Sequence, residues 1–240
     1  MNRHQCCLRQ LGCCTTPSVA CIVVDNGEPN LLNCVNSLLS QTRRCDEIIV
    51  APGPRSDRGA LERLRGIGVK VAEAVDRIGL ARVRAVLSTD ADIVVSCDSD
   101  SIYDEHYVEE AVKTLESGFK AVKAGHIEPL KWSIGAALEL PLATILPYEF
   151  GLAFWRKDFM KTRAVSLAQE IDNRLWDIGP VIAVEMQPIL VNPRMRVKTR
   201  LPTYAVKSFA KSWAAQIAGS VTPIAVATGL VTVAELLKKH

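Results

Sequence analysis

Two aspartates separated by one serine are the residues of this chain best suited to chemistry. Asp98 and Asp100 lie in the stretch DIVVSCDSDSIY at 92–103, where an apolar run ends in a polar turn. Carboxylates one residue apart can bind a divalent cation, because such cations prefer hard oxygen ligands. A cation held there would neutralise the charge of a diphosphate. The pair predicts a metal site for Mn²⁺ or Mg²⁺ with Asp98 and Asp100 as ligands, and the alternative is a polar strand end without a ligand.

The segments that would position this pair alternate between strand and helix patterns. Continuous apolar runs predict buried strands, and apolar residues at helical spacing predict the helices between them. We expect strands at 19–24, 47–51, 68–74, 92–98, 120–124 and 181–191, and helices at 30–41, 57–66, 80–87, 105–116 and 162–176. This alternation is typical of βαβ units and of a mostly parallel sheet.

Polar turns follow three of the predicted strands. They are Asp25-Asn26-Gly27-Glu28, the PGPRSD turn at 52–57, and Asp98-Ser99-Asp100. Because ligands of open α/β sheets bind beyond the carboxyl ends of the strands, the three turns predict one shared pocket. Arg55 in the second turn could meet a phosphate, and Asp57 could cap the following helix.

Four blocks of sequence, in order, resemble the family 2 inverting glycosyltransferases, whose fold is of the GT-A type. The blocks are VACIVVDNGEPNLLNCVNSLLSQT (19–42), EIIVAPGPRSD (47–57), GLARVRA (79–85) and IVVSCDSD (93–100). The resemblance covers residues 19 to about 118. It implies a three-layer αβα sandwich with a mostly parallel central sheet.

The resemblance also implies an activity and a set of site residues. The activity is metal-dependent transfer of a sugar, with inversion, from a nucleotide-diphospho-sugar to a glycan or lipid-linked acceptor. The implied donor-binding residues are Asp25, Asn26, Glu28, Arg55, Asp57, Arg84 and Asp98. The carboxyl half of such enzymes supplies the acceptor site and the catalytic base, and the matching stretch here is Gln169-Glu170-Ile171-Asp172. Either Asp172 or Glu170 would then take the proton of the acceptor hydroxyl.

One departure from the family pattern leaves other functions open. Pro52 and Gly53 stand where the family has adjacent aspartates after its second strand. A binding module of the same fold that has lost catalysis is therefore one alternative. A sugar-phosphate nucleotidyltransferase is another, although the turn after the first strand lacks the repeated glycines and basic residue that such enzymes use.

The bulk composition restricts the partners. The formal net charge is +3, the pI is near 8.4 and aromatic residues make up 5% of the chain. This balance suits an anionic small molecule or membrane surface and argues against nucleic-acid binding.

All eight cysteines lie within the first 97 residues, and Cys21, Cys34 and Cys97 fall inside apolar patterns, where a free thiol behaves as a small hydrophobe. We therefore expect no disulfide framework and a cytoplasmic location. Residues 1–17, with the doublets Cys6-Cys7 and Cys13-Cys14, are expected to form a flexible tail, because the doublets lack the usual spacing of zinc ligands.

The C-terminal part of the chain carries a different signal. Residues 213–234 contain no charged side chain, and lysines flank them on both sides. A stretch of 22 residues could reach across a bilayer, but its proline, glycines and small residues also suit an interfacial segment or packed helices. We expect a glycosyltransferase domain at 18–207, divided at 118/119 into donor and acceptor halves, and an apolar helical segment at 208–240. That segment would place the protein at the cytoplasmic face of a membrane.

Overall fold

The computed structural model describes residues 16–133, 136–137, 140, 151–171 and 177–200. Asp172, the cysteine doublets and the segment 208–240 lie outside these residues, and so does most of the predicted tail. The proposed division into domains stays a prediction. Among the residues that the structure describes, none of the helices is both long and apolar enough to span a bilayer.

The described elements follow one another along the chain in an order dominated by strand–helix alternation. They are β1 (Val19–Asp25), α1 (Leu31–Leu39), β2 (Glu47–Pro52), α2 (Arg58–Gly66), β3 (Lys70–Val71), α3 (Ile78–Leu87), β4 (Ile93–Asp98), β5 (Ser101–Tyr103), α4 (Tyr107–Glu116), β6 (Ala121–Pro129), β7 (Leu152–Trp155), α6 (Arg156–Phe159), α7 (Ala164–Glu170), α8 (Gly179–Glu185) and β8 (Ile189–Thr199).

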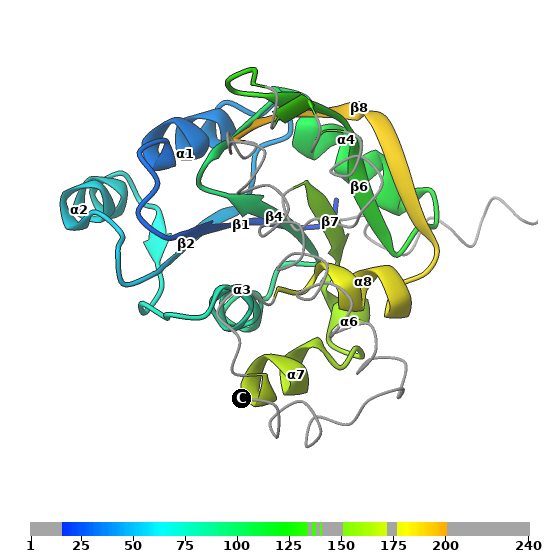
Figure 1. Ribbon diagram of the computed structural model, residues 1–240. Helices are drawn as coiled ribbons and strands as arrows, with labels where there is room; N and C mark the ends of the chain where they lie inside the picture. Colours follow the sequence, from blue (N-terminus) through cyan, green and yellow to red (C-terminus); the bar gives the residue numbers. More distant parts are fainter. Residues whose placement is uncertain (1–15, 134–135, 138–139, 141–150, 172–176, 201–240) are drawn as a thin grey trace, which may run out of the picture.

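The described strands form one sheet in the order β3-β2-β1-β4-β7-β6-β8-β5. The neighbours from β3 to β4 are parallel, and so are β6 and β8, whereas β7 and β5 run antiparallel to their neighbours. Helices α1, α2 and α4 cover one face and α3, α6, α7 and α8 the other (Figure 1). The predicted three-layer αβα architecture is confirmed.

Burial explains why the first strands could be recognised from the sequence. Every residue of β1 is buried, and so are five of the six residues of β2 and of β4. A strand covered by helices on both faces needs apolar residues throughout, so it appears as a continuous run without alternation. Helix α1 turns Leu31, Cys34, Val35 and Leu38 toward the sheet.

Two predicted strands differ from the structure, and the helix expected at 162–176 ends already at Glu170. Residues 181–191 were expected to form one strand, but Gly179–Glu185 is helix α8 and only the residues from Ile189 onward are strand. Pro180 at the first turn favours the helix, and Ile182 and Met186 lie on its buried side. The strand expected at 68–74 is only Lys70–Val71, because it pairs with β2 alone at the edge of the sheet.

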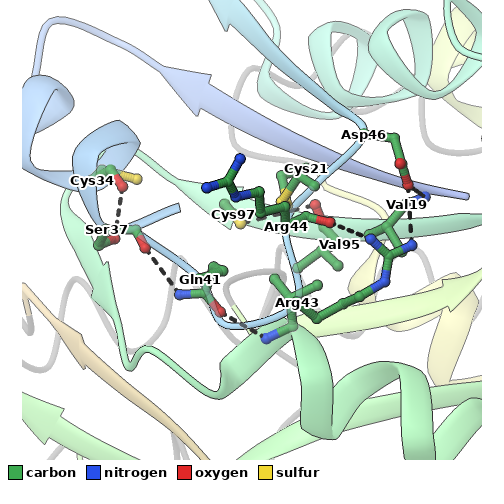
Figure 2. Close-up of a disulfide and its surroundings, with 12 residues drawn as sticks. Val19, Cys21, Cys34, Ser37, Gln41, Arg43, Arg44, Asp46, Val95 and Cys97 are labelled. Carbon is green, nitrogen blue, oxygen red and sulfur yellow. Dashed lines mark hydrogen bonds and ion pairs between the residues drawn. A yellow bond between two sulfur atoms is a disulfide. The ribbon is translucent and has the colours of Figure 1, made fainter. Parts of the chain in front are cut away.

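The expectation that Cys21 is a free thiol is wrong. Cys21 of β1 forms a disulfide with Cys45, with a Cα–Cα distance of 6.1 Å (Figure 2). The parallel pairing of β1 and β2 brings Cys45, just before β2, back to Cys21, which the sequence separation of 24 conceals. The cysteine-based argument for a reducing compartment therefore loses its support. Cys34 and Cys97 are free and buried, as expected.

Hydrogen bonds hold the same loop independently of the disulfide. The Asp46 carboxylate accepts the backbone N–H of Val19 at 2.8 Å and the Arg43 guanidinium at 3.2 Å (Figure 2). The loop before β2 is thus fixed to the start of β1 by polar contacts as well as by the covalent link.

We predict that Cys45→Ser lowers the free energy of unfolding by about 3 kcal/mol, because the disulfide closes a loop of intermediate length in the unfolded chain. For a chain of this size the melting temperature should fall by roughly 6–12 °C. Thermal melts with and without reductant measure this. The reductant should lower the melting temperature of the wild type and leave Cys45→Ser unchanged; equal melting temperatures of the oxidised wild type and the variant would contradict the prediction.

Candidate functional site

A buried arginine organises the carboxyl end of β4. Arg82 of α3 has a side chain that is only 1% exposed, and its Nη2 donates to the Asp98 carboxylate at 2.6 Å. Its Nη1 donates to the Ser96 hydroxyl at 2.8 Å and to the Cys97 carbonyl oxygen at 3.2 Å. The guanidinium therefore fixes both the last residues of β4 and the first aspartate of the Asp98-Ser99-Asp100 turn.

The same guanidinium reaches the carboxyl half of the chain. Its Nε and Nη2 donate to the two carboxylate oxygens of Asp177 at 2.9 and 2.8 Å, in a bidentate arrangement. Burial raises the pKa of Asp177 above its usual value, while the Arg82 charge opposes that rise. Asp177 also accepts the backbone N–H of Ile178 at 2.8 Å, so the start of α8 is held by the same carboxylate. Arg82 thus joins α3, β4 and the segment before α8.

The second aspartate of the turn, Asp100, has a raised pKa. Burial, and after it the neighbouring Asp98 carboxylate, raise the pKa of Asp100 to about 7. The Ser101 hydroxyl donates to Asp100 at 3.1 Å and counters part of this rise. Because the single positive charge of Arg82 is shared between Asp98 and Asp177, the turn keeps excess negative charge at Asp98 and Asp100, and such a position favours a cation.

The turn after β1 packs against the turn after β2. The buried Asp25 carboxylate accepts the backbone N–H groups of Gly27 and Glu28, both at 3.2 Å, and its carbonyl oxygen accepts the N–H of Gly53 at 2.6 Å. Gly27 has φ +87°, and a Cβ there would collide with the Arg55 carbonyl oxygen. The predicted meeting of these two turns is confirmed.

An ion pair links the first turn to the end of β8. Arg200 Nη1 lies 2.6 Å from the Glu28 carboxylate. The charge of Glu28 raises the pKa of Asp100 and that of Arg200 lowers it. Glu28 therefore belongs to the surroundings of Asp100, although its carboxylate is engaged by Arg200.

The remaining predicted donor residues have varied surroundings. Asn26 lies beside Gly53, where a Cβ would be 2.9 Å from its amide oxygen. Arg55 and Asp57 are exposed, and Asp57 caps α2 by accepting the N–H of Ala60 at 2.6 Å, as expected. Arg84 is exposed and lines a surface pocket with Pro54. Its donor-binding role stays a prediction, but the arginine that the structure brings to Asp98 is Arg82.

The two candidate bases cannot both be located. Glu170 is the last residue of α7 and is exposed, while Asp172 lies outside the described residues. The backbone between them is fixed at one point, because Arg77 donates to the Ile171 carbonyl oxygen at 3.1 Å. This contact ties the end of α7 to the start of α3.

Sequence reasoning missed Arg82 and Asp177. Arg82 lies in a helix whose neighbours Ala81, Val83, Ala85 and Val86 are all buried, so the pattern has no polar face to which an arginine would belong. An arginine within such an apolar helix was the available signal, since a charge there must find a partner. Asp177 precedes Ile178 and follows Leu175-Trp176, and its apolar surroundings were the corresponding signal.

The carboxylates of the turn fit a divalent cation that a ligand helps to hold. Among the described residues there is no group of three or more His, Cys, Asp or Glu side chains placed to bind a metal. Mg²⁺ is commonly bound by one or two carboxylates, with phosphate oxygens and water completing its shell. Asp100 and the neighbouring Asp98 would supply the one or two carboxylate ligands of such a coordination shell.

The family model described as Glycosyl transferase family 2 matches residues 19–136. This part of the chain is similar to glycosyl transferase family 2. The family 2 region contains β1 to β6, and with them the three turns and Arg82, so the resemblance seen in the sequence is confirmed. No curated protein matches the chain.

The structural likeness to a solved protein covers more of the chain than the family match does. The crystal structure of S. aureus TarS superposes with a TM-score of 0.54 at 12% sequence identity, and the match covers 84% of this chain and 40% of the TarS chain. At this identity the likeness concerns the fold alone, and it agrees with the GT-A type expected. This chain thus corresponds to less than half the length of TarS.

We predict that Arg82→Ala lowers the free energy of unfolding by about 3–5 kcal/mol, because Asp177 would remain buried without its partner. The matched control is Arg84→Ala, which removes an exposed arginine of the same helix and should change stability by about 0.5 kcal/mol or less. Urea unfolding of the two variants measures the difference. Equal effects of the two substitutions would contradict the role assigned to Arg82.

A second prediction concerns pH. The native state retains a proton on Asp100 up to about pH 7, because its pKa is raised well above that of an ordinary aspartate. The unfolded chain releases that proton at lower pH, so the contribution of Asp100 to stability falls as pH rises from about 4 to 7. We expect Asp100→Asn to match the wild type in melting temperature near pH 4 and to exceed it at pH 8. The control is Asp90→Asn, which replaces a fully exposed aspartate. A difference in melting temperature between Asp100→Asn and the wild type that does not vary with pH would contradict the prediction.

Proposed function

We propose that this chain is a metal-dependent inverting glycosyltransferase that moves a sugar from a nucleotide-diphospho-sugar to a glycan or lipid-linked acceptor. The observation that carries the proposal is the Asp98-Ser99-Asp100 turn, held by buried Arg82 beside the turns after β1 and β2. The backbone N–H of Ser99 donates to the Val24 carbonyl oxygen at 3.0 Å, so the turns after β1 and β4 are in direct contact. The family assignment of residues 19–136 supports this reading.

In this proposal the turns divide the donor between them. The nucleotide lies against the turns after β1 and β2, with Asp25, Asn26 and Glu28 in the first and Arg55 and Asp57 in the second. The diphosphate lies toward Asp100. A divalent cation, Mn²⁺ or Mg²⁺, would supply charge neutralisation of the departing diphosphate there. Arg82 keeps Asp98 oriented through the 2.6 Å contact.

The sugar transfer needs a carboxylate on the acceptor side. The base, Glu170 or Asp172, takes the proton of the acceptor hydroxyl while that oxygen attacks the anomeric carbon from the side opposite the diphosphate. The bond from the anomeric carbon to the diphosphate oxygen breaks, and its electron pair leaves with the diphosphate. Asp177 is the poorer candidate, because Arg82 binds both of its carboxylate oxygens. The uncharged stretch at 213–234 supports an acceptor close to a membrane.

A non-catalytic nucleotide-binding module is the second candidate. Pro52 and Gly53, which stand in place of the family's aspartates, favour it. In this structure the Gly53 N–H is used by Asp25 and a Cβ at Gly53 would approach Asn26 closely, so the position serves the packing of the two turns.

We predict that nucleoside diphosphates or nucleotide-sugars raise the melting temperature only when Mn²⁺ or Mg²⁺ is present. At a ligand concentration of 100 times Kd the native state gains about 2.7 kcal/mol, which corresponds to roughly 5–10 °C. Asp100→Ala should abolish this metal-dependent shift, whereas Asp90→Asn should retain it. A shift that is unchanged in Asp100→Ala would refute the proposed metal site.

The same preparations distinguish a transferase from a binding module. Release of nucleoside diphosphate from the donor is followed in the wild type, in Glu170→Gln and in Asp172→Asn. One of the two substitutions should lower the rate by about 10²–10⁴ while the metal-dependent thermal shift persists. Binding without release by the wild type, with every candidate acceptor, would instead identify a binding module.

A further inference from the structure

One face of β8 carries basic side chains at every second position. Arg194, Arg196 and Lys198 point away from the core, and Arg200 follows directly after the strand. We call these four residues the basic stripe. The side chains of Lys198 and Arg200 are 61% and 60% exposed. Over six residues of extended chain the stripe measures about 20 Å.

A β-bulge creates this arrangement. Asn192 and Met195 are both buried although they are three positions apart, and the register of β8 against β6 shifts between Ala124 and His126. Since side chains alternate along a strand, Arg196 and Lys198 would share the inward face with Asn192 if the strand were regular. Gly125 permits the bulge, because a Cβ there would lie 2.8 Å from the Asn192 carbonyl carbon. The bulge thus turns the side chains of Arg196 and Lys198 outward.

Part of the charge of the stripe is not compensated by the residues that the structure describes. Lys198 lies 3.3 Å from the Glu128 carboxylate, and Arg200 lies 2.6 Å from that of Glu28. Within the described part of the chain, Arg194 and Arg196 make no ion pair. Arg196 and Lys198 also line a surface hollow with His126 and Glu128. Among the described residues, the guanidinium groups of Arg194 and Arg196 are therefore available to an anionic partner.

The surroundings of the stripe indicate the class of that partner. Leu130 donates its backbone N–H to the Thr199 carbonyl oxygen at 2.8 Å, so Trp132, which is 66% exposed, follows close to the end of β8. Beyond Arg200 the sequence has Lys207 and Lys211, and then residues 213–234 without a charge. Tryptophan, basic residues and an uncharged stretch together are typical of contact with a lipid headgroup region.

We propose that the basic stripe docks on the headgroups of an anionic membrane. Each arginine or lysine near such a surface contributes about 1 kcal/mol, and the attraction falls off within a Debye length. The proposal rests on the membrane-proximal acceptor proposed above and names the surface that would face the bilayer. It does not depend on the identity of the sugar or of the nucleotide.

Co-sedimentation of the full chain with vesicles tests the proposal. Vesicles of phosphatidylglycerol with phosphatidylcholine are compared with vesicles of phosphatidylcholine alone. The test variant is Arg194→Glu/Arg196→Glu. The matched control is Arg63→Glu/Arg65→Glu, which reverses two exposed arginines of α2, at the other end of the sheet, with the same change of net charge (Figure 1).

We expect the test variant to bind anionic vesicles at least about tenfold more weakly than the wild type at low salt, and the control to bind like the wild type. High salt should remove the difference. The metal-dependent nucleotide shift should be the same in all three proteins. Failure of nucleotide binding would refute the proposed function, whereas vesicle binding decides the docking proposal.

Three results would overturn the proposal. The first is wild-type vesicle binding by the test variant. The second is an equal loss in both variants, which would show a general effect of net charge. The third is a loss of turnover on a soluble phosphate-bearing acceptor with unchanged vesicle binding, which would assign the stripe to the acceptor.

Discussion

The Arg82 guanidinium lies almost completely out of water, and the arrangement of the site depends on how its charge is compensated. Removing such a group from water costs several kcal/mol, which only close and well-oriented partners can offset. Asp177 supplies two of them in a bidentate contact and Asp98 a third at 2.6 Å. Because these partners come from separate parts of the chain, the requirement to compensate one charge fixes the relative positions of α3, the end of β4 and the start of α8.

This arrangement gives the two aspartates of the Asp98-Ser99-Asp100 turn different roles. Asp98 is oriented by Arg82, which also binds Asp177. Asp100 lies next to it, with a pKa raised to about 7 first by burial and then by Asp98. A turn built in this way presents Asp100, a carboxylate that makes no ion pair among the described residues, near Glu28 of the turn after β1. In the proposed enzyme that imbalance is relieved when a cation and a diphosphate bind together.

The sequence alone predicted the elements whose pattern is set by burial. The strands at Val19, Glu47 and Ile93 and the helices between them are continuous apolar runs or clear helical spacings, so their existence follows from local composition. Residues 181–191 are as apolar as a strand, but Pro180 and the packing of Ile182 and Met186 make the first part a helix. The Cys21–Cys45 disulfide could not be predicted, because it follows from strand pairing.

The sequence was sufficient to predict which turns form the site, but not which side chains contact one another within it. Asp98, Asp100 and Glu28 do lie around one place, because carboxyl ends of neighbouring parallel strands meet. The partner of Asp98 was not predictable, since Arg82 and Arg84 are equivalent in the sequence and only the orientation of α3 distinguishes them. The outward direction of Arg196 and Lys198 depends on the bulge beside Gly125, which no local pattern reveals.

The most direct test of the central claim is the position of the metal in a crystal soaked with Mn²⁺ and a nucleoside diphosphate. Anomalous scattering locates Mn²⁺ without assumptions about the protein. The account predicts one Mn²⁺ in contact with the Asp100 carboxylate and with diphosphate oxygens, while Asp98 keeps its contact with Arg82. A bound nucleotide without metal at Asp100, or Mn²⁺ bound at a different group of residues, would contradict it.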